Sequence, residues 1–177
     1  DAAIQRVVES GKFVMGHEME AFETEFAAYC GAQHAVGVGS GTAALHLALL
    51  ACDIGPGDEV ITVPNTDIPT TMTISHCGAE IVWVDTQPRT FNIDPEKIEA
   101  QITPHTKAIL PVHMFGYPAD MEPIMEIAER HDLLVIEDAA LAVGAEYHGK
   151  KAGTIGHVGC FSLAPTKVFG AYGDAGI

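Results

Sequence analysis

Basic residues are scarce in this sequence. Its 177 residues include nine Lys and Arg against 24 Asp and Glu, which gives a formal net charge of −15. Binding to a phosphate backbone depends on clusters of Lys and Arg, so this balance argues against a nucleic-acid-binding protein. We interpret the excess of acidic residues as an acidic, solvated surface.

Paired cysteines are also lacking, because no two cysteines stand in a CxxC arrangement. The four cysteines are far apart in the sequence: Cys30, Cys52, Cys77 and Cys160. This pattern predicts free, buried thiols in a reducing compartment and not a disulfide framework or a zinc site. The nine histidines do not pair at the spacing of metal ligands, so we expect no metal site.

Long apolar runs are absent, and none of the apolar stretches could cross a bilayer. Residues 1–11, DAAIQRVVESG, lack the basic start and apolar centre of a signal peptide. Together with the expectation of reduced thiols, these absences predict a cytoplasmic protein that does not bind membranes.

What the sequence does contain is an alternation of short apolar runs and helical patterns, with 47% hydrophobic residues. The apolar runs predict strands at His34–Val38, Glu59–Val63, Glu80–Val84, Ala108–Val112, Leu133–Ile136 and Val158–Leu163. The helical patterns predict helices at Glu18–Tyr29, Ala43–Ala51, Thr70–Cys77, Pro95–Gln101 and Ala119–His131. This order is typical of an α/β protein with three layers, α/β/α, and a mostly parallel sheet.

In such sheets, ligands bind beyond the carboxyl ends of the strands. The segments that follow the predicted strands are therefore the candidate site: residues 40–42, 65–67, His113, Asp138 and 162–167. In the first of these, Gly39-Ser-Gly-Thr42 joins a strand to a helix, where free N–H groups attract an anion such as phosphate. Taken alone, this motif is explained more simply as a glycine-rich turn with a Ser or Thr cap.

Two further residues make the pattern more specific. Lys167 lies on the loop after the last predicted strand, and Asp138 ends an aliphatic strand. A partly desolvated lysine can form a Schiff base with a carbonyl. Lysine, carboxylate and phosphate-binding turn are the three groups that pyridoxal 5′-phosphate (PLP) requires, the carboxylate facing its pyridine nitrogen.

Several motifs resemble one known family in the order in which they occur. They are "SGTAALHLAL", "IGPGDEVITVP", "TFNIDPEKIEAQITPHTKAILPVHMFGYPADM", "LLVIEDAA" and "GCFSLAPTKVFGAYGDAGI". From about Phe13 to the last residue, the sequence resembles the DegT/StrS-type sugar-nucleotide aminotransferases, fold-type I PLP enzymes. The resemblance implies an aspartate aminotransferase-like large domain with a seven-stranded sheet, and a homodimer. It also implies amino-group transfer, commonly from glutamate, to a keto-sugar linked to a nucleotide.

The resemblance also assigns roles to individual residues. Lys167 matches the Schiff-base lysine, and Asp138 matches the acid that pairs with the pyridine nitrogen. The phosphate-binding positions are matched by Gly41, Thr42 and Ser162. His113 also matches the family pattern, either as a substrate-binding residue or as a support for the strand end.

Three positions depart from the family pattern. Leu141 stands where Gln is usual, and Val143 stands where His is common. Asp67, in the pair Thr66-Asp67, stands where an aromatic residue normally stacks on the cofactor ring. Either the alignment shifts in this loop, another group covers the ring, or cofactor binding is altered.

The family's antiparallel strand, which lies between the first strand and the strand before the lysine, would begin at Ala175–Ile177. We therefore interpret residues 1–177 as the PLP-binding large domain, truncated before its sheet is complete and without the smaller C-terminal domain. The main hypothesis is an aminotransferase. The alternative is a non-catalytic regulatory or interaction protein of the same fold. A Rossmann-type nucleotide-binding protein is disfavoured because no GxGxxG motif occurs.

Overall fold

The computed structural model describes residues 2–177, which form two compact units. The first unit ends at Gly37 and contains helices α1 (Ala2–Ser10) and α2 (His17–Cys30). Arg6 connects the two helices by donating two hydrogen bonds to the Glu18 carboxylate, from Nε at 2.6 Å and from Nη2 at 3.1 Å. Helix α2 confirms the helix predicted at Glu18–Tyr29, whereas α1 was not predicted.

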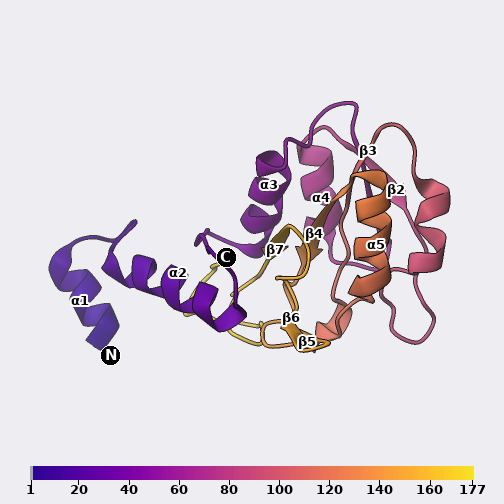
Figure 1. The fold of residues 1–177 in the computed structure, drawn as a ribbon. Helices are drawn as coiled ribbons and strands as arrows, with labels where there is room; N and C mark the ends of the chain where they lie inside the picture. The colour runs from indigo at the N-terminus through magenta and orange to yellow at the C-terminus, as the bar shows by residue number, and fades with distance from the viewer. Residues whose placement is uncertain (1) are drawn as a thin grey trace. The chain divides into compact units, whose positions relative to one another are not determined.

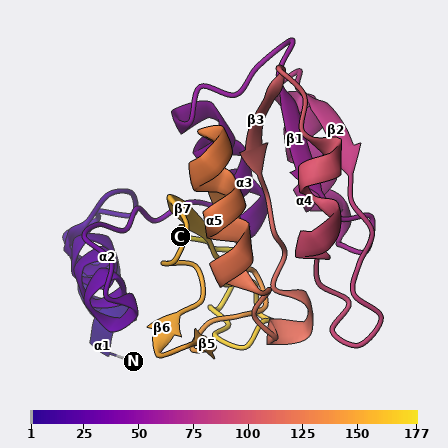
Figure 2. The ribbon, with the colours of Figure 1, turned by 45° about the vertical axis from the view of Figure 1, so that its right-hand side comes forward.

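The second unit, Val38–Ile177, contains the sheet. Its parallel strands are β1 (Glu59–Thr62), β2 (Glu80–Trp83), β3 (Thr106–Ile109), β4 (Leu134–Asp138) and β7 (Val158–Cys160). They follow the spatial order β2-β1-β3-β4-β7, and Figure 2 shows β1, β2 and β3 side by side. The predicted α/β class with a mostly parallel sheet is confirmed.

The helices of this unit cover both faces of the sheet. They are α3 (Gly41–Ala51), α4 (Ile68–His76) and α5 (Met121–His131), shown in Figure 1. The β1-α4-β2 and β3-α5-β4 connections run in opposite directions along the sheet. Because such crossovers are right-handed, α4 and α5 lie on opposite faces. Helix α3 contacts α4 and therefore shares its face.

The strands carry the apolar core. Val60 and Ile61 of β1 and Val135 and Ile136 of β4 are fully buried. This burial agrees with the near-continuous apolar runs of strands that are covered on both faces. Strand β2 lies at the end of the sheet order, and its burial is only partial.

The last residues pair in the antiparallel direction, as the sequence predicts. Gly176 forms antiparallel bridges with Val38 on one side and Ser162 on the other. The N–H groups of Val38 and Gly176 each donate to the other's carbonyl at 2.9 Å. This pairing places the start of α3 beside the segment that follows β7.

The predicted strand His34–Val38 is wrong in extent, because only Val38 pairs, through its isolated bridge. The preceding segment is held by α2 instead. The Gly37 N–H donates to Glu23 Oε1 at 2.8 Å, and a Cβ at Gly37 would lie 2.2 Å from the Met19 methyl carbon. The segment therefore runs along α2 without forming a strand.

The predicted helix Pro95–Gln101 is two short 3₁₀ helices, η1 (Pro95–Lys97) and η2 (Glu99–Gln101). Seven residues are too few to offset the cost of nucleating an α-helix. The tighter 3₁₀ geometry also places Pro95 and Ile98 on one face, where both are buried. The predicted cap is confirmed, because the Asp94 side chain accepts from the Glu96 N–H.

A hairpin of β5 (Glu146–Tyr147) and β6 (Lys150–Lys151) was not predicted. Its turn residues, His148 and Gly149, have φ of 49° and 79°. Two consecutive positive φ angles give the turn whose twist suits a two-residue hairpin.

All four cysteines are free, as predicted, although Cys52 is only partly buried. None of the described helices combines the length and apolar character needed to cross a membrane.

Candidate active site

Five of the residues predicted from the sequence as site residues meet at the carboxyl edge of the sheet. His113 follows β3, Asp138 ends β4, and Ser162 and Lys167 follow β7. Gly41, at the start of α3, lies against Ser162, where a Cβ on the glycine would come within 2.6 Å of the serine Cβ. The parallel order of the strands is therefore what brings these separate segments together.

Asp138 is the buried acid of this edge. Its side chain is held on both oxygens, because Thr70 Oγ1 donates to Oδ2 at 2.7 Å and the Ala140 N–H donates to Oδ1 at 3.1 Å. Burial raises the pKa of Asp138 above its ordinary value, while these two hydrogen bonds and the positive charge of Lys167 oppose the rise. Lys167 is thus near enough to Asp138 to influence its charge.

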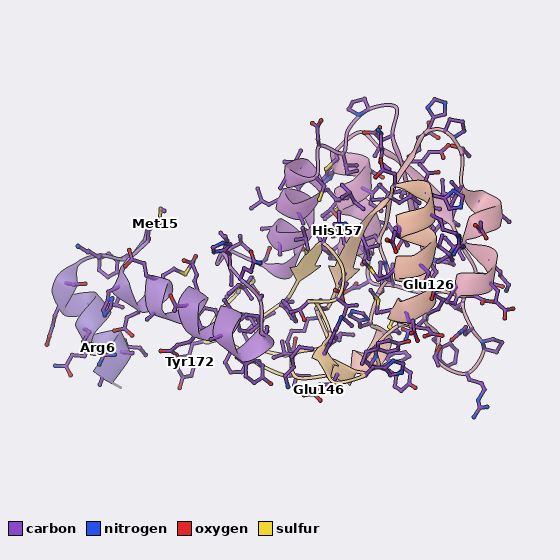
Figure 3. All side chains as sticks on the ribbon, in the orientation of Figure 1. Arg6, Met15, Glu126, Glu146, His157 and Tyr172 are labelled. Atoms are coloured by element: carbon purple, nitrogen blue, oxygen red, sulfur yellow. The ribbon has the colours of Figure 1, made fainter. Side chains whose placement is uncertain are left out.

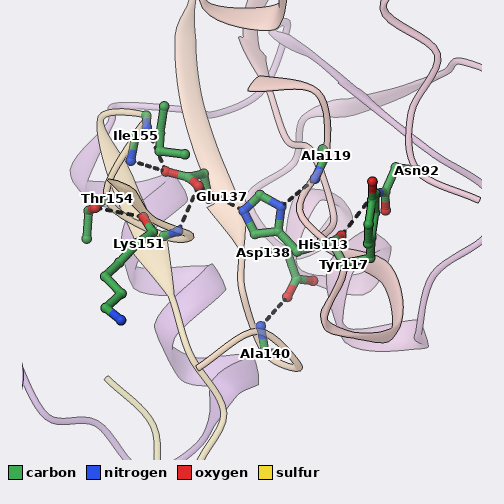
Figure 4. Close-up of polar contacts among 12 residues, drawn as sticks. Asn92, His113, Tyr117, Ala119, Glu137, Asp138, Ala140, Lys151, Thr154 and Ile155 are labelled. Carbon is green, nitrogen blue, oxygen red and sulfur yellow. Dashed lines mark hydrogen bonds and ion pairs between the residues drawn. The ribbon is translucent and has the colours of Figure 1, made fainter. Parts of the chain in front are cut away.

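Glu137 precedes Asp138 in β4, points to the other side of the strand and is fully buried. Its Oε2 accepts from His113 Nε2 at 2.8 Å and from the Gly153 N–H at 2.7 Å. Its Oε1 accepts from the N–H groups of Ile155 at 2.7 Å and Gly156 at 2.6 Å. Figure 4 shows this carboxylate between His113 and the 152–156 loop.

Burial alone would raise the pKa of Glu137. The hydrogen bonds from His113 and from the Gly156 and Gly153 N–H groups outweigh burial and hold the pKa below its ordinary value. Glu137 is therefore a buried carboxylate satisfied entirely by N–H donors. It fixes the 152–156 loop, which leads into β7, against the end of β3.

His113 has no free ring nitrogen. Its Nδ1 accepts from the Ala119 N–H at 3.0 Å, which leaves the ring proton on Nε2, where it is donated to Glu137 (Figure 4). Its backbone N–H also donates to the Asp138 carbonyl at 3.0 Å. Of the two roles that the sequence leaves open for His113, this geometry favours support of the strand end over contact with a substrate.

Another histidine, His157, aligns the strand that leads to the lysine loop (Figure 3). Its ring nitrogen Nδ1 accepts from the Val135 N–H at 2.9 Å, and its backbone N–H donates to the Val135 carbonyl at 2.8 Å. This double contact fixes the start of β7 beside β4. The register then places Cys160 opposite Asp138.

The turn at Gly41 and Thr42 is the candidate anion site. Ser40 caps α3, its side chain accepting from the Ala43 N–H at 3.1 Å. Within residues 2–177, the N–H groups of Gly41 and Thr42 have no acceptor. Unpaired N–H groups at a helix start bind anions, and the Ser162 side chain lies directly against Gly41.

Lys167 lies on a compact loop. Its backbone N–H donates to the Ala164 carbonyl at 2.9 Å, and the Ala171 N–H donates to the Leu163 carbonyl at 2.8 Å. A Cβ at Gly170 would come within 2.7 Å of the Pro165 carbonyl oxygen, so the loop closes only with glycine there. The loop leaves Lys167 partly buried at the strand edge.

The departures from the family pattern have clear structural positions. Asp67 is exposed and caps α4, its carboxylate accepting from the Ile68 N–H at 2.9 Å. Leu141 lies in the turn after Asp138, and its carbonyl oxygen would lie 2.8 Å from a Cβ on Gly116. Neither residue supplies an aromatic face.

An exposed aromatic pair also occurs in the strand-end loops. Phe91 and Phe115 contact each other edge to face, with ring centroids 6.2 Å apart, and both have positive φ, 63° and 57°. Asn92 connects the two loops by donating to the Tyr117 carbonyl and accepting from the Met114 N–H, each at 2.9 Å.

Three contributors to the site were not identified from the sequence: Thr70, the anchoring role of Glu137, and Asn92. Each acts through a partner at least 16 residues away, as Glu137 does with Gly153 and Thr70 does with Asp138. The only available signal was the acidic pair at the end of β4, of which one member is now seen to point away from the site.

The side chains at this edge suit a ligand that carries three groups: a carbonyl, a basic ring nitrogen and a phosphate. An amine at Lys167 can attack a carbonyl, a carboxylate at Asp138 can pair with a basic ring nitrogen, and the Gly41 turn with Ser162 can hold a phosphate. Among the described residues, no cluster of three or more His, Cys, Asp or Glu could hold a metal ion.

This sheet, with a lysine loop, an acid and the capped start of α3 at one edge, has the large-domain fold of the PLP-dependent, aspartate aminotransferase-like transferases. Solved structures of this fold agree. DesV of S. venezuelae, solved in complex with a ketimine intermediate, matches with a TM-score of 0.97 and 49% identity, over 99% of this chain and 47% of that one. NtdA of Bacillus subtilis, solved with bound cofactor PMP, matches with a TM-score of 0.91 and 41% identity, over 98% of this chain and 39% of that one.

Among curated proteins, a dTDP-3-amino-3,4,6-trideoxy-alpha-D-glucose transaminase of Streptomyces venezuelae is 49% identical over 176 residues. The match covers 99% of this chain and 46% of that protein. The sequence profile of the DegT/DnrJ/EryC1/StrS aminotransferase family matches residues 1–177, and the chain belongs to that family. The chain spans about half the length of the curated relatives it matches.

Proposed function

We propose that residues 1–177 form the cofactor-binding large domain of a PLP-dependent aminotransferase that acts on a keto-sugar linked to a nucleotide. The observation that carries the proposal is the convergence of Lys167, Asp138 and the Gly41–Ser162 contact at one sheet edge. Similarity to a transaminase named for a dTDP-linked amino sugar supports the substrate class.

The residues present fit PLP. The N–H groups of Gly41 and Thr42 and the Ser162 hydroxyl would hold its phosphate, and Asp138 would face its pyridine nitrogen. Lys167 would bind its aldehyde. When bound, PLP supplies an electron sink that stabilises negative charge on a substrate carbon.

The protein's own contribution is charge and proton transfer. Ionised Asp138 favours the protonated form of the ring nitrogen, because an opposite charge next to a basic group stabilises its charged form. Lys167, once its amine is free, is the base that removes a proton from the donor carbon and the acid that returns one. Asp138 and Lys167 are the residues to which we assign catalysis.

Other parts of the proposal rest on the family resemblance. From it we infer glutamate as the amino donor and a homodimer as the assembly, whereas the cytoplasm as the location is inferred from the free cysteines. The first can be tested with a panel of amino acids in a coupled 2-oxoacid assay, and the second by light scattering after size exclusion.

The cofactor assignment is tested by absorbance. The protein incubated with PLP should gain a visible band that borohydride bleaches, and peptide mass spectrometry should then find the cofactor on Lys167. Lys167→Ala should lose the band and keep its fold by circular dichroism. Lys151→Ala is the matched control, because this lysine lies on β6 and its ammonium donates to Glu146 at 2.7 Å.

The same experiment decides the alternative hypothesis, a non-catalytic regulatory or interaction protein. A chain without a band after PLP incubation would favour that alternative. A band that persists in Lys167→Ala would refute the lysine assignment.

A further inference from the structure

Two threonines connect the exposed side of α4 to the buried acid. Thr70 stands in the first turn of α4 and is 1% exposed. Its Oγ1 lies 2.7 Å from Asp138 Oδ2, to which it donates, and 2.6 Å from Thr66 Oγ1. Thr66, one residue before the Asp67 cap, is only partly buried.

The charge of Asp138 fixes the direction of these hydrogen bonds. An ionised carboxylate can only accept, so the single Thr70 hydroxyl proton must point at Asp138. Thr70 then has only lone pairs to offer, so Thr66 must donate to it. If Asp138 were protonated on Oδ2, both hydrogen bonds could reverse. The order Thr66 to Thr70 to Asp138 therefore belongs to the ionised acid.

We propose that Thr70, ordered by Thr66, is a positioning residue that keeps Asp138 ionised and fixes the rotation of its carboxylate. The inference rests on the proposed function only where it concerns the cofactor, because the two hydrogen bonds exist without it.

The surroundings of Asp138 show why such a donor is needed. Burial raises the pKa of Asp138, and the Thr70 hydrogen bond is the strongest influence that lowers it. The other ionisable groups facing it are Lys167, His113 and Cys160, which lies opposite Asp138 in the β4–β7 register. Glu137 precedes it on β4, but its carboxylate is taken up by His113 and the 152–156 loop.

The decisive experiment measures Asp138 directly, without relying on activity. Aspartate labelled with ¹³C at the carboxyl carbon is followed by NMR against pH in the cofactor-free protein, with Asp138→Asn to assign the signal. Thr70→Val removes the hydroxyl and should raise the pKa of Asp138 by about 1–2 units, since a hydrogen bond to a charged group contributes ~1.5–3 kcal/mol. Thr70→Ser should restore the parent titration.

Thr73→Val is the matched control. Thr73 is fully buried on the same helix, and its hydroxyl donates to the Thr70 carbonyl at 3.1 Å, away from the acid. It should leave the Asp138 titration unchanged. An unshifted titration in Thr70→Val, or an equal shift in Thr73→Val, would overturn the proposal.

Thr66→Val provides a second test if Thr70→Val does not fold. It removes the donor that orders Thr70 and should shift the titration in the same direction by a smaller amount. No shift would refute the ordered chain. The absorbance of added PLP against pH then separates this proposal from the proposed function. If the Asp138 titration moves while the cofactor band does not, the threonine role stands and the pairing of Asp138 with the ring fails.

Discussion

Replacing Glu137 with Gln should severely destabilise the fold at neutral pH. The carboxylate accepts four hydrogen bonds, two on each oxygen, and is completely buried. An amide has one accepting oxygen, so its NH₂ group must face two of the four N–H donors. Each buried donor that loses its partner costs about 1–3 kcal/mol, which predicts a loss of about 2–6 kcal/mol. That is a large part of the ~5–15 kcal/mol that typically stabilises a domain.

The pH dependence has a definite sign. The folded pKa of Glu137 is lowered, so its stabilisation is complete above the ordinary carboxyl pKa of the unfolded chain, ~4.3. It is lost as pH falls through the lower folded value. The difference in unfolding free energy between the parent and Glu137→Gln should therefore be largest near neutral pH and shrink in acid.

Urea denaturation followed by circular dichroism at several pH values measures both effects. Glu126→Gln is the control, because Glu126 is exposed on α5, labelled in Figure 3, and should change stability by no more than ~0.5 kcal/mol. A loss below 1 kcal/mol for Glu137→Gln, or one that does not vary with pH, would refute this account of the buried carboxylate.

Three further predictions follow from the same structure. Gly41→Ala should weaken PLP affinity in a fluorescence titration and lower the free energy of unfolding by about 1–3 kcal/mol, because the new Cβ would overlap the Ser162 side chain. Gly39→Ala is the control, because a Cβ there meets open space and should change neither quantity. Asp138→Asn should lower kcat about 10- to 100-fold, because one charge-assisted hydrogen bond contributes about 1.5–3 kcal/mol, and it should change PLP affinity less. Equal turnover in this variant would count against the role of Asp138. Burial and the hydrogen bond to Asp120 raise the pKa of Tyr147 to about 12, so an ultraviolet titration should show one tyrosine ionising near that pH. Asp120→Asn should bring that step down, and a persistent step near 12 would exclude this cause.

Local patterns in the sequence were sufficient to predict most of the sheet and its helices. Strands β1 and β4 are apolar runs buried on both faces, and α5 is predicted from the acids near its start and from Arg130 and His131 in its last turn. The site residues Asp138 and Lys167 could be proposed because parallel strands end at one edge.

What could not be predicted depends on contacts between distant segments. The segment before Val38 fails to form a strand because a Glu23 side chain takes its N–H group. Glu137 and Asp138 are adjacent in sequence, yet alternation along β4 sends one to the 152–156 loop and the other to the site. Only the fold decides which carboxylate serves which purpose.

The central claim is that Lys167 and Asp138 hold one PLP ring between them. A crystal structure of the protein soaked with PLP tests it most directly. We predict a covalent bond from Lys167 Nζ to the aldehyde carbon, and the pyridine nitrogen at hydrogen-bonding distance from Asp138, about 2.7–2.9 Å. The phosphate should lie on the Gly41 turn. A ring bound elsewhere, or one whose nitrogen does not face Asp138, would contradict the account.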